Sequence, residues 1–194
     1  MAQQVLRFSG GSPQLLIALA GAGWAFTYLN QIRTDQRNGQ LARVNEQLRE
    51  LYGPLLSCVT AAKATFDAMV LQHSPDGTGA GLRRAYSEDP QCDSASAYRL
   101  WVQEVFHPLN ERAAELIIAR SDLMLGMKVE PSMPMLVAHV AATRIAIKQW
   151  TAGDFSKRNL VHFPDDLHIS VRAHFETLRL RQAVLLGVGS KSRL

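Results

Sequence analysis

Glu104 and His107 are the side chains whose spacing comes nearest to that of a known metal site. They stand three residues apart, which places a carboxylate and an imidazole on one face of a helix. Di-iron bundles need two such pairs plus a Glu from each of two more helices. The similar stretch Asp165–His168 falls where a helix is expected to begin, and carboxylates there cap the helix and complement its dipole. No metal site is predicted, and Glu104 is expected to point outward because Trp101 and Val105 claim the core face.

The remaining candidates for acid–base or nucleophilic chemistry have no partners nearby in the sequence. His139 lies in an apolar run and is expected to be a hydrogen-bonded core histidine rather than a ligand or base. Cys58 falls at an apolar helical position, Cys92 lies in a polar loop, and the pair suits a reducing compartment without forming a disulfide framework. If the chain were an enzyme, its site would be assembled across helices, with Glu104, His107 and His139 the residues to inspect first.

Other ligand-binding patterns are also missing from the sequence. The glycine-rich stretch 77–81 lacks the preceding strand and the following lysine of a phosphate-binding loop. Basic residues are spread along helices rather than gathered with aromatic residues, so nucleic-acid binding is not predicted. The net charge of +4 and the pI near 9.3 are mildly basic and by themselves select no partner. No cofactor is predicted.

The segment 13–32 is predicted to anchor the protein in a membrane as a single transmembrane helix. It lies in the uncharged run between Arg7 and Arg33, and its apolar part 13–29 just meets the lower limit of about 17 residues for spanning a bilayer. Its strongly apolar residues favour insertion by about 3 kcal/mol in total; they are Leu15, Leu16, Ile17, Leu19, Phe26 and Leu29. The alternatives are a core or interfacial helix and a signal peptide, whose small-residue cleavage site would have to fall after the apolar run.

One face of the predicted anchor consists of small residues, which let transmembrane helices pack closely. These residues are Ala18, Gly21, Ala22 and Ala25. Arg33, Arg37 and Arg43 follow the segment, whereas Arg7 precedes it. The positive-inside rule therefore puts the C-terminal domain in the cytoplasm, or in the matrix or stroma of an organelle.

The rest of the chain has the composition and patterning of one folded helical domain. Of the 194 residues, 47% are hydrophobic and 20% are charged. Apolar residues recur at helical spacing, and no stretch alternates long enough to predict a strand. The expected helices cover residues 41–69, 98–123, 133–150 and 164–186, ending before Gly126, Gly153 and Gly187, with a loop region over 73–95.

The predicted fold class is therefore all-α, with an N-terminal transmembrane helix followed by an antiparallel bundle of about four helices. The bundle domain is expected over residues 38–187. A tail of residues 1–12 precedes the anchor, and a basic flexible tail of residues 188–194 ends the chain.

Three stretches together carry a resemblance to a known family. They contain Leu51-Tyr52-Gly53-Pro54-Leu55, then Trp101 to Pro108-Leu109-Asn110-Glu111, then Leu136 to Val140 with Trp150 to Ser156. In this order they resemble an uncharacterised family of N-terminally membrane-anchored helical proteins from bacteria and microalgae, over roughly residues 40–187. The resemblance implies an anchored helical domain and supplies no activity.

The same residues also have a purely structural interpretation. Gly53 and Pro54 permit a bend across which Tyr52 packs, and Asn110 follows Pro108 in the first turn of a restarted helix.

We expect a non-enzymatic, membrane-anchored interaction protein that serves as an accessory or assembly subunit of a larger membrane complex. Its partners would be other membrane proteins and the lipid bilayer, with a homo-oligomer left open. One alternative is a sensory or regulatory module that signals through helix movement, because the anchor runs on toward the apolar stripe that starts at Leu41. The other is an enzyme with a site between helices.

Overall fold

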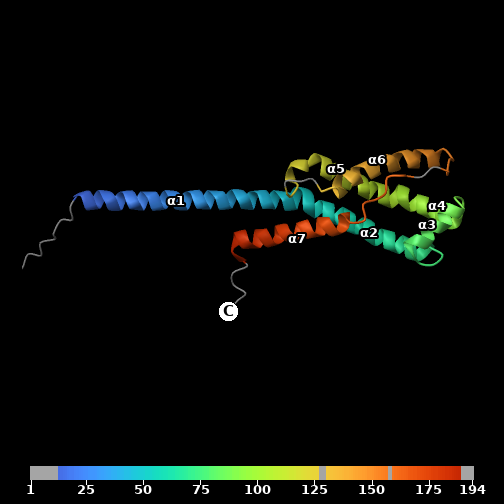
Figure 1. Cartoon of the computed structure of the whole chain (residues 1–194), viewed down its shortest axis with the longest axis horizontal. Coiled ribbons are helices and arrows are strands. Elements are labelled where there is room, and N and C mark those ends of the chain that lie inside the picture. Colours follow the sequence, from blue (N-terminus) through green and yellow to red (C-terminus); the bar gives the residue numbers. More distant parts are fainter. Residues whose placement is uncertain (1–12, 127–129, 157–158, 189–194) are drawn as a thin grey trace, which may run out of the picture. The chain divides into compact units, whose positions relative to one another are not determined.

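A computed structural model describes residues 13–126, 130–156 and 159–188, with the backbone alone at 13–16, 18 and 20. The chain divides into two units, Met1–Ala42 and Arg43–Leu194. The all-α prediction is confirmed, and the described residues contain no strand (Figure 1). The long helices are α1 (Pro13–Glu46), α2 (Gly53–His73), α5 (His107–Ala119), α6 (Ser132–Thr151) and α7 (Leu167–Leu186). The short elements are α3 (Gly79–Glu88), α4 (Asp93–Trp101), the π-helical turns η1 (Gln47–Tyr52) and η2 (Val102–Phe106), and the 3-10 turn η3 (Ser121–Leu123).

The short helix α3 lies within the region 73–95 where a loop was expected, and α4 already begins at Asp93, so this prediction was wrong. Capping explains both helices. The Thr78 hydroxyl accepts a hydrogen bond from Gly81 N at 2.9 Å, and the Cys92 sulfur accepts one from Ala95 N at 3.4 Å. Gly79 and Gly81 instead lie in the first turn of α3, where the Asp76 carboxylate packs so closely on Gly81 that a side chain there would collide with it.

The other helix boundaries follow the glycines. Gly126, Gly153 and Gly187 all have positive φ, between 73° and 85°, as expected of glycines that end helical segments. α7 begins at Leu167, after a turn at 165–166, rather than at Pro164. The predicted tail 1–12 and residues 189–194 of the C-terminal tail lie outside the described residues.

The second unit is built on α2, which packs against α5 and α7, while α6 packs on α5. Figure 1 shows these four helices side by side, with α3 and α4 at the end where α2 finishes. Leu51, Leu55, Leu136 and Leu178 are fully buried in the core. Burying each such side chain contributes about 1.5–3 kcal/mol before the cost of ordering it.

A second, smaller cluster lies where α2, α3 and α4 meet. Met69, Val70 and Leu82 are its buried centre, with partly buried aromatic rings around them. Those rings are Phe66, Tyr86, Tyr98, Trp101 and Phe106. Trp150 extends the cluster to the end of α6, since its ring lies edge-on to Tyr98 with the centroids 6.4 Å apart. Trp101 and Trp150, both of which belong to the stretches that carry the resemblance, are thus packing residues of this end.

Both prolines expected to interrupt helices follow a π-helical turn. A proline inside an α-helix has no N–H for the carbonyl four residues back, and its ring collides with that carbonyl. In η1 the hydrogen bond before the proline reaches five residues back, from Gly53 N–H to Leu48 O, and Pro54 then starts α2. In η2 the bond from His107 N–H to Val102 O is equivalent, and Pro108 starts α5. The chain therefore stays helical through both prolines.

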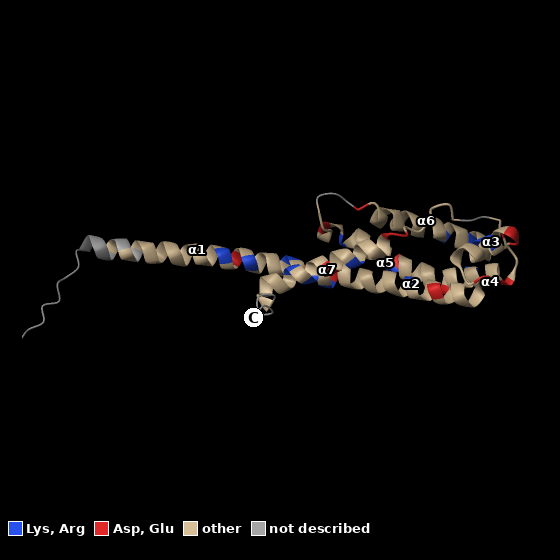
Figure 2. Ribbon diagram, turned by 60° about the horizontal axis from the view of Figure 1, so that its bottom comes forward, with Lys and Arg blue, Asp and Glu red and all other residues tan. Residues whose placement is uncertain are grey.

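The first unit holds most of α1. Figure 2 shows the charged residues of α1 confined to its C-terminal part. Among the described residues, the continuous helix Gly21–His73 is long and apolar enough to cross a membrane. Its 18-residue window of mean hydropathy 1.3 is 28% buried and so includes residues of the second unit, because none of residues 21–43 is buried. Length and composition alone do not separate a membrane span from a core helix. The two ends differ in burial, because Leu55 and Val59 of α2 lie in the core whereas Trp24 and Phe26 of α1 are exposed.

Candidate functional site

A polar cluster of the bundle that contains a buried histidine lies between α5 and α6. His107, whose side chain is nine-tenths buried, directs Nε2 to Glu111 Oε1 at 3.2 Å. Arg144 of α6 donates to the same carboxylate oxygen at 2.6 Å. Nδ1 of His107 is buried and has no hydrogen-bond partner among the described residues. Burial lowers the pKa of His107, the Glu111 carboxylate opposes that shift, and the Arg144 hydrogen bond lowers the pKa of Glu111.

A second polar group surrounds His139, which lies five residues before Arg144 in α6. His139 Nδ1 lies 2.6 Å from Val161 O, so we assign the ring proton to this nitrogen. Asn159 closes the group, since its side-chain amide donates to Thr143 Oγ1 at 2.7 Å and to His139 O at 3.1 Å. Burial lowers the pKa of His139, with nearby His107 adding to the effect, so that the neutral ring is favoured.

Glu104 does not take part in either group. It is exposed and belongs to η2, in which side chains three residues apart no longer share a face as they do in an α-helix. The carboxylate beside His107 is instead Glu111, one helical turn later in α5. The described residues contain no cluster of three or more His, Cys, Asp and Glu side chains placed for a metal ion. The Glu104–His107 pair read from the sequence is therefore not formed.

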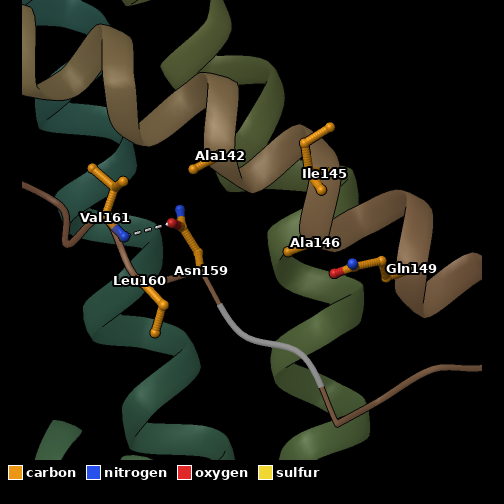
Figure 3. A pocket seen from close by; sticks show the side chains of 7 residues that line it. All are labelled: Ala142, Ile145, Ala146, Gln149, Asn159, Leu160 and Val161. Atoms are coloured by element: carbon orange, nitrogen blue, oxygen red, sulfur yellow. Dashed lines mark hydrogen bonds between the residues drawn. The ribbon is translucent and has the colours of Figure 1, made fainter.

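A shallow depression of about 350 Å³ lies beside the His139 group (Figure 3). Its lining is mainly apolar and consists of Ala142, Ile145, Ala146, Gln149, Asn159, Leu160 and Val161. Asn159 Oδ1 accepts from Val161 N at 2.8 Å, and its amide nitrogen is engaged by Thr143 and His139. The Asn159 side chain at the rim therefore holds the segment 159–161 on α6, and its hydrogen-bonding atoms already have partners.

Tyr52, in the stretch that carries the resemblance, is part of a second arrangement that holds a loop rather than a ligand. Tyr52 is fully buried and its hydroxyl accepts from Leu125 N at 2.9 Å. Gln47 donates to Leu123 O at 2.9 Å, and Arg43 donates to Asp122 O. These side chains are spaced by four and then five residues, and the extra residue of η1 keeps Tyr52 facing the loop. We call Arg43, Gln47 and Tyr52 the loop clasp.

The other residues singled out in the sequence around Pro54 and Pro108 also have structural roles. Gly53 lies so close to Leu48 O that a Cβ atom would sit 2.6 Å from that oxygen. Pro54 and Pro108 stand at the starts of α2 and α5, and Asn110 is buried on α5. The Gly-Pro and His-Pro pairs mark these positions in the sequence. They predict a bend and a helix restart, whereas the structure has a π-helical turn before each proline.

Both cysteines are free and half-buried. Burial raises the pKa of the Cys58 thiol, which opposes formation of the reactive thiolate. Cys92 caps α4 through its sulfur. Each cysteine thus has a structural position of its own.

The small residues of the predicted anchor are open on the surface of α1. Gly21, Ala22 and Ala25 are exposed, and a Cβ atom added at Gly21 would meet nothing within 4 Å. The side chain of Ala18 lies outside the described residues.

Comparison of the chain with protein-family models, with curated proteins and with solved structures finds no match.

Proposed function

We propose that this protein is a non-enzymatic, membrane-anchored interaction protein, an accessory or assembly subunit of a larger membrane complex. In this proposal residues 13–32 form a single transmembrane helix and the second unit is an antiparallel bundle on the cytoplasmic side, or on the matrix or stroma side of an organelle membrane.

The supporting observation is the distribution of exposed apolar side chains around the first part of α1. Ile17 and Trp24 are 72% and 71% exposed, and at about 100° per residue they project to one side of the helix. Leu19 and Phe26, also mostly exposed, project to the opposite side. A groove on one partner protein covers one side of a helix, whereas a bilayer covers all sides. A helix that is apolar all round and unburied by its own chain therefore fits a lipid environment.

The C-terminal end of this segment suits a membrane interface. Trp24, near the middle of residues 13–32, stacks on Tyr28 with the centroids 5.5 Å apart, and Tyr28 lies nearer the end of the segment, where tyrosine favours the headgroup region. Arg33 and Arg37 follow on the same helix. The order of an apolar segment, then Tyr28, then Arg33 and Arg37 supports the orientation with the second unit on the cytoplasmic, matrix or stroma side.

A first experiment tests anchoring by alkaline extraction of membranes from cells that make the full chain. The double variant L19R/F26R places two charges in the segment, each costing about 2.5–3.5 kcal/mol at a helix centre, against a total insertion energy of about −3 kcal/mol. We expect the wild type to stay in the membrane pellet and the variant to be extracted. L71R, which adds one arginine at an exposed site on α2, should stay in the pellet. A wild-type chain in the supernatant would refute the anchor.

A second experiment tests the accessory-subunit role by mild-detergent extraction, native sizing and mass spectrometry of what comes with the chain. We expect the wild type to run in a defined assembly and G21L to leave it, because a bulky residue disturbs the small-residue face. G39L is the matched control, since Gly39 lies on the same helix with nothing within 4 Å of an added Cβ atom. A wild-type chain that runs alone as a small monomer or dimer would contradict the proposal.

A further inference from the structure

The outer face of α7 carries a row of apolar side chains that the bundle does not cover. Ile169 and Leu180 are each 70% exposed and Val184 is 73% exposed. They lie on the side opposite Val171 and Leu178, which are fully buried in the core. We call Ile169, Leu180 and Val184 the outer row. A helix that is apolar on both sides has a second surface to bury besides its own core.

Arginines border this row on both edges. At about 100° per residue, Arg179 falls on one edge and Arg181 on the other. Arg179 donates to Gln182, and neither arginine forms an ion pair within the described residues. Glu176 is exposed on the same side of α7, between Ile169 and Leu180. After Glu176, the rest of α7 carries apolar and positively charged side chains and no acidic one.

The chain itself brings this end of α7 close to the anchor. Gln182 donates to Asn45 at 2.7 Å, so the second half of α7 lies beside the residues with which the second unit begins. Residues 33–42 alone separate Arg43 from the predicted anchor, and this stretch spans at most about 35 Å however it is arranged. The outer row and its arginines are thus tethered near the membrane surface.

We propose that the C-terminal half of α7 docks on an anionic lipid surface, with Leu180 and Val184 entering the headgroup boundary and Arg179 and Arg181 contacting lipid phosphates. The inference rests on the anchor of the proposed function. Apolar residues bordered by arginines suit an anionic leaflet, because the ring of positive charge binds headgroups while the apolar centre leaves water. The contact gives the bundle a second attachment that fixes its orientation at the membrane.

The test uses the full chain in nanodiscs of neutral phosphatidylcholine, or of phosphatidylcholine with phosphatidylglycerol. V184C is labelled with a water-soluble maleimide, and peptide mass spectrometry reads this site separately from Cys58 and Cys92. We expect labelling to be slower in the anionic discs and to recover at high salt. Adding R179Q/R181Q should weaken docking about 30-fold, since each basic residue contributes roughly fivefold near such a surface. L71C, an equally exposed site on α2, is the control and should label equally in both discs.

The possible results distinguish a missing lipid contact of α7 from a missing membrane anchor. Equal labelling of V184C in both kinds of disc would overturn the lipid contact while leaving the anchor intact. Protection of V184C in native membranes but not in anionic discs would show that a protein covers the row, which also overturns the inference. Failure of the chain to enter discs at all would instead refute the anchor.

Discussion

The π-turn at Gly53 predicts that replacing this glycine with alanine lowers the free energy of unfolding, whereas the same replacement at Gly39 does not. Gly53→Ala puts a Cβ atom 2.6 Å from Leu48 O, the oxygen that accepts the Gly53 N–H bond. The substitution adds up to about 1 kcal/mol of helix propensity. Against this gain, losing the hydrogen bond costs about 1 kcal/mol and shifting the packed backbone costs about 1–3 kcal/mol. The net expectation is a loss of about 1–3 kcal/mol.

The assay is unfolding of the full chain in detergent, by urea and by heat, followed through the tryptophan fluorescence of the bundle. For a domain of this size, the loss corresponds to a fall in Tm of roughly 2–12 °C. Gly39→Ala is the matched control. Gly39 is exposed in α1 with nothing within 4 Å of an added Cβ atom, so alanine there should leave the bundle unchanged or gain up to about 1 kcal/mol.

The reasoning fails if G53A is as stable as the wild type while G39A behaves as expected. That result would mean that the helix returns to regular α geometry around residue 53 without cost. The loop clasp would then have to form without the extra residue that η1 supplies.

Two further predictions concern the polar groups of α5 and α6. Burial lowers the pKa of both His107 and His139, so the stability that their neutral rings contribute is fully present above the ordinary histidine pKa of about 6.5 and is lost as the pH falls below it. Urea unfolding at pH values of about 7.5 and 5.5 should show this loss, and H139Q should reduce it; greater stability in acid would contradict the assignment. Asn159→Ala leaves the Val161 N–H and the Thr143 and His139 oxygens without their partner, so it should lower the unfolding free energy by about 1–3 kcal/mol. Asn38→Ala on exposed α1 should change it little.

The parts of the fold that depend on local chemistry could be predicted from the sequence. The period of the apolar residues indicates the long helices, and the glycines at 126, 153 and 187 mark the ends of helical segments because glycine adopts positive φ without strain. α3 could not be predicted in this way. Its glycine-rich start resembles a loop, and the helix forms because Thr78 caps it and Leu82 packs into the aromatic cluster.

The candidate sites were predictable only where both partners lie on one helix. Glu111 stands four residues after His107, so this contact was within reach of sequence reasoning, whereas the choice of Glu104 assumed regular α geometry across η2. Arg144 reaches Glu111, and Asn159 reaches His139, from elsewhere in the chain, and no local pattern indicates such contacts. The loop clasp likewise joins side chains to a loop more than seventy residues away.

Residues 13–73 are helical without a break, yet their amide hydrogens should exchange with solvent at very different rates. Around Leu51 and Leu55, which are fully buried, exchange requires opening of the core and should be among the slowest in the protein. Residues 33–40 are polar or glycine and all exposed, so their helical hydrogen bonds can open locally and exchange fast. A zone of low local stability would then adjoin the protected core within one continuous helix, and the chain there would bend by brief local unfolding without disturbing the bundle.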